Sequence, residues 1–107
     1  MADNICELRP QGRIDSATGP AFEKDVLQQI DDGQRLVLLD FAELQYISSA
    51  GLRIVLLAAK KMKTAGGKLV LCSLNPQIAE VFQISGFSNI LDIHPSRDSA
   101  LSILSAT

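Results

Sequence analysis

Apolar residues follow two different periods along this chain, one typical of strands and one typical of helices. Segments of strand length occur at residues 5–8, 11–14, 36–39, 68–72 and 90–93. Between and after them, apolar residues recur at helical spacing over about 15–32, 49–65, 76–85 and 96–104. Asn75 and Ser96 are the expected N-caps of the last two helices. The alternation predicts an α/β fold in which about four helices pack on a mixed, mostly parallel sheet of four to five strands.

The individual elements differ in how much of their surface is apolar. The continuous apolar run of residues 36–39 predicts a strand that is covered on both faces and is therefore central in the sheet. Pro10 interrupts the extended segment near the start, which predicts an edge strand or a hairpin there. In the second helix, which is apolar on most sides, the spacing predicts one stripe that faces the sheet: Leu52, Val55, Leu56, Ala59 and Met62.

Composition restricts the possible classes of function more than it restricts the possible folds. The 107 residues suit one domain, residues 1–107, and the net charge of −2 gives no basic excess with which to neutralise nucleic-acid phosphates. Cys6 and Cys72 lie in apolar runs and are expected to be reduced core thiols, which suits a cytoplasmic protein. The longest uninterrupted apolar run, Ile54–Ala59, is too short to cross a bilayer, and the first residues lack the features of a signal peptide.

The sequence also lacks the residue groups on which common enzyme mechanisms depend. His94 is the single histidine and is expected in an exposed loop, so a hydrolytic triad with a serine has no support. No His and Cys residues have the spacing of metal ligands. Gly66, Gly67 and Lys68 follow a helix instead of preceding one, so they do not form a phosphate-binding loop. We therefore expect no enzymatic activity, no cofactor and no metal.

The segment from Asp40 to Arg53 carries the candidate chemistry. It predicts a buried strand ending in Asp40, a turn that Asp40 orders by accepting backbone N–H bonds, and then Ser48 and Ser49 opening the second helix. Free backbone N–H groups and the positive end of the helix dipole favour negative charge at such a position. Either serine also fits the ordinary role of an N-cap, whereas a phosphate there would change the charge of any surface docked over it.

Several short motifs, taken together and in this order, resemble the signature of the anti-sigma factor antagonist family, the STAS domain. They are Gly12–Asp15, Asp40, Ser48–Arg53, Gly66–Lys68 and Phe82–Phe87. The resemblance covers nearly the whole chain and implies a small cytoplasmic protein of a bacterial partner-switching pathway. In that family the unphosphorylated form binds an anti-sigma factor that is also an ATP-dependent serine kinase. Phosphorylation by this kinase ends the binding, and a serine phosphatase restores it.

The resemblance also assigns residues. Aligned by Gly51 and Leu52, the regulatory phosphoacceptor is Ser49, with Ser48 as a competing acceptor. The turn at Asp15, a residue that also suits the N-cap of the first helix, falls near the phosphoacceptor and at the partner surface. The expected partner-binding residues are therefore Asp15, Ser48, Ser49, Gly51, Leu52 and Arg53. Two positions depart from the family, which often has Asp where Ser48 stands and Ser where Ala50 stands.

Two alternatives stay open at this point. In the first, the protein is a STAS domain that serves as a fixed subunit, either a non-phosphorylated scaffold of a stress-signalling assembly or a component associated with a transporter, and Ser49 is a plain cap. In the second, Ser49 is the nucleophile of a small hydrolase or phosphoryl-transfer enzyme. The single histidine disfavours this second alternative.

Overall fold

The structure is a computed structural model and describes residues 5–87 and 91–106. Within them the elements follow in the order β1 (Ile5–Leu8), β2 (Gly12–Ile14), α1 (Gly19–Asp31), β3 (Leu36–Asp40), β4 (Leu44–Ile47), α2 (Ser49–Thr64), β5 (Lys68–Cys72), α3 (Pro76–Ile84), β6 (Asp92–His94) and α4 (Arg97–Ser105). The predicted alternation of strands and helices is confirmed.

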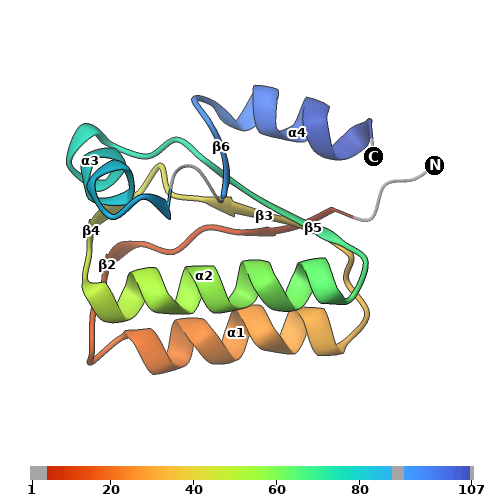
Figure 1. Ribbon diagram of the computed structural model, residues 1–107, viewed down its shortest axis with the longest axis horizontal. Helices are drawn as coiled ribbons and strands as arrows, with labels where there is room; N and C mark the ends of the chain where they lie inside the picture. Colours follow the sequence, from red (N-terminus) through yellow and green to blue (C-terminus); the bar gives the residue numbers. More distant parts are fainter. Residues whose placement is uncertain (1–4, 88–90, 107) are drawn as a thin grey trace.

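The described strands form two parallel sheets. The larger has the order β1-β3-β5-β6, and the smaller pairs β2 with β4. Helices α1 and α2 lie side by side on one face of the larger sheet, and α4 covers the other face (Figure 1). The predicted α/β class and the central place of β3 are confirmed. The hairpin alternative near Pro10 is wrong, because β1 and β2 belong to different sheets.

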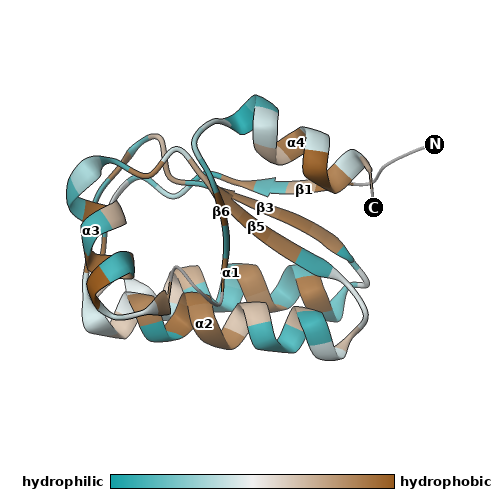
Figure 2. Ribbon diagram, turned by 45° about the horizontal axis from the view of Figure 1, so that its top comes forward, coloured by the Kyte–Doolittle hydropathy of each residue, from teal (hydrophilic) through white to brown (hydrophobic). Residues whose placement is uncertain are grey.

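The apolar residues of β3 and β5 supply the core on both faces of the larger sheet (Figure 2). In β3, Val37 and Leu39 face the cluster under α1 and α2, whereas Leu38 faces the cluster under α4. All three side chains are fully buried. The continuous apolar run in the sequence therefore reflects cover on two sides, because successive side chains of a strand point to opposite faces.

The orientation of α2 differs from the predicted stripe. Its buried apolar side chains are Leu52, Val55, Ala58 and Met62. The prediction that Leu56 faces the sheet is wrong, since Leu56 is half-buried and packs at the margin of the core. Because α2 is apolar on most sides, periodicity alone did not fix which residues meet the sheet and which meet α1.

Four further sequence predictions have different outcomes. Asn75 and Ser96 cap α3 and α4 through their side chains, as expected. The first helix begins at Gly19 and not at Asp15, since residues 15–18 form a separate turn. His94 is half-buried in β6 and not in an exposed loop. The last strand was expected to begin at Ile90, which lies outside the described residues.

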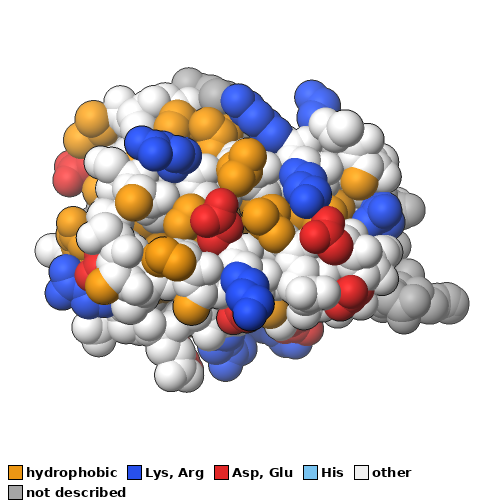
Figure 3. Space-filling view, turned by 90° about the horizontal axis from the view of Figure 1, so that it is seen from below, with side chains coloured by type: hydrophobic (Ala, Val, Ile, Leu, Met, Phe, Trp, Pro, Cys, Tyr) orange, Lys and Arg blue, Asp and Glu red, His pale blue; other side chains and the backbone are white. Residues whose placement is uncertain are grey.

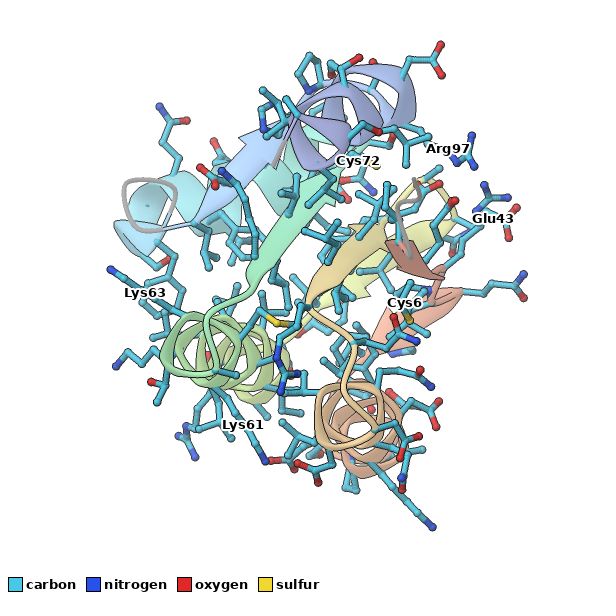
Figure 4. All side chains as sticks on the ribbon, turned by 90° about the vertical axis from the view of Figure 1, so that its right-hand side faces the viewer. Cys6, Glu43, Lys61, Lys63, Cys72 and Arg97 are labelled. Atoms are coloured by element: carbon cyan, nitrogen blue, oxygen red, sulfur yellow. The ribbon has the colours of Figure 1, made fainter. Side chains whose placement is uncertain are left out.

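The two cysteines are unpaired, and they lie on β1 and β5, on either side of the central strand (Figure 4). Burial is the main cause that raises the pKa of each thiol above its ordinary value. Both are therefore neutral thiols near pH 7. Among the described helices, none has the length and apolar character that a membrane crossing requires.

Candidate functional site

The ends of the small sheet bring the candidate residues to one edge of the molecule. Ile14 of β2 lies opposite Ile47 of β4, and the amide of Ser48 donates a hydrogen bond to the carbonyl of Ile14 at 2.8 Å. Because β2 and β4 are parallel, the turn that follows β2 and the start of α2 lie at the same edge. This pairing brings Asp15 near the helix start, as the sequence predicted.

Ser48 is the N-cap of α2. Its backbone is extended, and its Oγ accepts a hydrogen bond from the amide of Gly51 at 3.2 Å. The side chain is half-buried. A capping hydroxyl of this kind satisfies one of the free amides that begin a helix. Ser48 therefore has a structural task that occupies its oxygen.

Ser49 is the first residue of α2 and is exposed. Within the described residues its hydroxyl makes no hydrogen bond, in contrast to that of Ser48. The first turn of α2 contains no acidic residue, whereas the last turn contains Lys61 and Lys63. The positive end of the helix dipole is therefore complemented by no acidic side chain of the first turn, and an anion there would be stabilised.

Gly51 and Leu52 set the position of this turn, and both are buried. A Cβ atom on Gly51 would lie 2.6 Å from Cγ1 of Ile47 and 2.9 Å from Cγ2 of Ile14. Leu52 is 6 % exposed and belongs to the core. Close approach of the helix to both strands thus requires glycine at position 51. A direct partner contact by these two residues, as the sequence suggested, does not fit their burial.

Asp15 organises the turn between β2 and α1. Its Oδ1 accepts hydrogen bonds from the amides of Ala17 and Thr18 at 2.9 and 3.0 Å, and its Oδ2 accepts one from Nε of Arg13 at 2.8 Å. The amides of Thr18 and Ala17 are the main cause that lowers the pKa of this carboxyl below its ordinary value. Asp15 is therefore charged over the whole physiological range and caps a turn that precedes the helix.

Arg13 and Tyr46 belong to the same edge, and sequence reasoning missed both. The guanidinium of Arg13 lies over the ring of Tyr46, 4.8 Å from its centroid. Tyr46 is 47 % exposed, so its ring belongs to the surface of this edge. One signal was present: Arg13 and Asp15 belong to the same short motif, Gly12–Asp15.

A groove of about 310 Å³ runs between the first turns of α1 and α2. Its apolar part includes Ala50, Ile54 and the 45 %-exposed Leu57, and its charged part includes Asp15, Glu23 and Arg53. Figure 3 shows hydrophobic side chains interspersed with acidic and basic ones on the face formed by these two helices. The groove therefore offers both apolar and charged contacts.

Asp40 lies apart from this edge and has a structural role. Its side chain is 3 % exposed and pairs with Nη2 of Arg9 at 3.1 Å. Its Oδ1 accepts a hydrogen bond from the amide of Ala42 at 3.0 Å. As predicted, this carboxylate orders the turn before β4. In the described part of the chain, no group of three or more His, Cys, Asp and Glu side chains could hold a metal ion.

Comparison with known proteins identifies the family of this chain. The model of the STAS domain family matches residues 1–100. The chain belongs to the STAS domain family, among the anti-sigma factor antagonists. BtrV of Bordetella bronchiseptica, named as an anti-sigma factor antagonist, is 49 % identical to this STAS domain, over 84 % of this chain and 78 % of BtrV. The anti-sigma-B factor antagonist of Listeria monocytogenes is 32 % identical, over 77 % of this chain and 72 % of its own length.

Solved structures share the fold of this STAS domain. An anti-sigma factor antagonist from Mycobacterium paratuberculosis aligns with a TM-score of 0.90 at 20 % identity, over 98 % of this chain and 89 % of that one. Unphosphorylated SpoIIAA aligns with a TM-score of 0.76 at 17 % identity, over 100 % of this chain and 94 % of its own. The resemblance drawn from the sequence motifs is thereby confirmed for family and fold.

Proposed function

We propose that this STAS domain is an anti-sigma factor antagonist whose binding to its partner is ended by phosphorylation of Ser49. The partner is an anti-sigma factor that is also an ATP-dependent serine kinase, and a serine phosphatase reverses the modification. The domain itself acts in the cytoplasm as a binding protein and not as an enzyme. The names of its relatives support the class of partner.

One observation carries the choice of Ser49. The two adjacent serines divide two tasks between them, because Ser48 caps the helix while the hydroxyl of Ser49 is exposed and bonded to no described residue. A kinase can reach such a hydroxyl without opening the helix. Modification of Ser48 would instead remove the cap and expose a half-buried side chain.

The docking surface that we propose surrounds Ser49 and consists of Asp15, Ser48, Arg53, Tyr46 and the groove beside Leu57. Phosphate brings about −1.5 to −2 charges at neutral pH. At the start of α2 it stabilises the helix, so the domain stays folded. Under a docked partner the same charge must be desolvated, which weakens binding.

The test begins with the cognate kinase, which co-purification with the tagged chain and mass spectrometry would identify. Its binding to the purified domain is then measured by titration calorimetry for the wild type, Ser49→Asp and Ser48→Asp. We expect Ser49→Asp to fold normally and to bind at least about tenfold more weakly, a loss of about 1.4 kcal/mol. Incubation with kinase and ATP, followed by intact-mass analysis, should add one phosphate to the wild type and to Ser48→Ala, but none to Ser49→Ala.

The opposite pattern identifies the alternatives. If Ser48→Ala blocks phosphate incorporation and Ser49→Ala does not, the phosphoacceptor is Ser48. If the wild type binds the partner but takes up no phosphate, the protein is a fixed subunit, and the proposed switch is wrong.

A further inference from the structure

We infer that Arg53 is the intramolecular counter-ion of the phosphate on Ser49. This inference rests on the proposed phosphorylation and names the residue that receives the new charge. It follows from the positions of the two residues on α2 and from the ion pair that engages Arg13, the other arginine at this edge.

The helix places Arg53 over Ser49. The two residues are four positions apart near the start of α2, and both are exposed. Residues at this spacing have Cβ atoms about 5–6 Å apart on one face of a helix. Helical side chains lean toward the helix N-terminus, so the guanidinium of Arg53 extends toward the first turn. An acidic group four residues before a basic one is also the more favourable order for such a pair.

Arg53 is available, whereas Arg13, the other arginine at this edge, is engaged. Arg13 pairs with Asp15 and covers the ring of Tyr46. Arg53 makes no ion pair with any described carboxylate, although Asp15 and Glu23 line the same groove. A guanidinium with free N–H donors can bind phosphate through two parallel hydrogen bonds.

The consequence for the switch is a double change of charge. Before phosphorylation, Arg53 offers a cation to a docked partner beside the groove. After phosphorylation, the same guanidinium is paired with the phosphate, and the local charge has become negative. Loss of a positive contact and gain of an anion therefore occur in one step, at neighbouring positions of one helix face.

The test installs phosphoserine at position 49 during protein synthesis, so that no kinase is required. The pKa of the phosphate is measured by phosphorus NMR in the wild-type background and in Arg53→Gln, Arg53→Lys, Arg13→Gln and Lys60→Gln variants. A nearby cation favours the dianion, so Arg53→Gln should raise the pKa of the phosphate by about 0.2–0.4. Arg53→Lys should raise it less. Lys60→Gln, an exposed change farther along α2, should leave it unchanged.

An unchanged phosphate pKa in Arg53→Gln would overturn the inference. So would a larger rise in Arg13→Gln than in Arg53→Gln, because the phosphate would then be held by Arg13. Far-ultraviolet circular dichroism shows whether each variant is folded. If Arg53→Gln does not fold, the comparison of Arg53→Lys with the wild type decides the test. None of these results depends on partner binding, so the inference and the proposed function can fail independently.

Discussion

The two ends of helix α2 differ in the groups that stabilise them. At its C-terminal end, near Thr64, the protein satisfies the helix with its own groups: Lys61 pairs with Asp31 of α1 at 3.0 Å, and the amide of Gly67 donates to the carbonyl of Met62 at 2.9 Å. Lys61 and Lys63 extend from this end (Figure 4). At the N-terminal end, Ser48 caps one amide and no acidic residue complements the dipole.

The C-terminal end of α2 therefore contributes to stability, whereas the N-terminal end is suited to the proposed function. The C-terminal turn, residues 61–64, is the closed end: it adds an ion pair and a buried methionine, which stabilise the fold. The N-terminal turn, residues 48–52, is the open end: it packs closely against β2 and β4 through Gly51, which holds it in place. No acidic residue of its first turn complements the helix dipole. A closely packed helix start whose dipole lacks an acidic partner is suited to receive phosphate without rearrangement.

The largest expected effect lies at the closed end. Met62 is fully buried in the core, so Met62→Ala should lower the free energy of unfolding by about 2–5 kcal/mol through lost burial and a residual cavity. Leu57→Ala is the control on the same helix, because Leu57 is 45 % exposed, and it should cost below about 1 kcal/mol. Urea unfolding followed by circular dichroism measures both. Equal losses would show that the C-terminal part of α2 is not better packed than its exposed face.

The next effect tests whether the open end is rigid because it lies so close to the strands. Gly51→Ala should lower the free energy of unfolding by about 1–2 kcal/mol, since crowding against Ile47 and Ile14 exceeds the gain in helix propensity. Gly19→Ala is the matched control, because its new Cβ would meet the terminal methyl of Ile54 at 3.0 Å, and that flexible group can move. A stabilising effect of Gly51→Ala in thermal unfolding would contradict the close packing.

The sequence predicted elements better where one local signal decided the structure. The strand β3 follows from its own apolar run, and the caps at Asn75 and Ser96 follow from the side chains of those residues. All three were predicted correctly. The orientation of α2 depends on packing against both α1 and the sheet. An almost uniformly apolar helix does not encode that choice in its spacing, so Leu56 was misplaced.

The candidate site divides in the same way. The serines and Asp15 were located from motifs, because each occupies a turn or a helix start that the sequence marks. The contact of Arg13 with Tyr46 was missed, since it depends on the pairing of β2 with β4 across a long stretch of chain. The separate roles of Ser48 and Ser49 also required the backbone geometry, because either serine could have been the cap by sequence.

A smaller effect distinguishes these two serines. Ser48→Ala should lower the free energy of unfolding by about 1 kcal/mol, because the amide of Gly51 loses its acceptor. Ser49→Ala removes an exposed hydroxyl that bonds to no described residue, so it should change stability by less than about 0.5 kcal/mol. Urea unfolding of both variants measures the difference. The reverse order would place the cap at Ser49 and weaken its assignment as the free phosphoacceptor.

The smallest effect concerns pH at the turn beside the open end. The pKa of Asp15 is lowered in the folded protein, chiefly by the amides of Thr18 and Ala17 and also by Arg13. A lowered pKa means that the charged carboxylate stabilises the fold above its ordinary pKa of 3.8, and that this contribution is lost as the pH falls through the folded-state value. Asp15→Asn keeps an acceptor but cannot titrate. The stability difference between the wild type and Asp15→Asn should therefore be constant from pH 7 to about 5 and should shrink below about pH 4. Urea unfolding across this range measures it. A difference that stays constant down to pH 2 would mean that the turn does not favour the charged form of Asp15, and that its amides are satisfied as well by a neutral side chain.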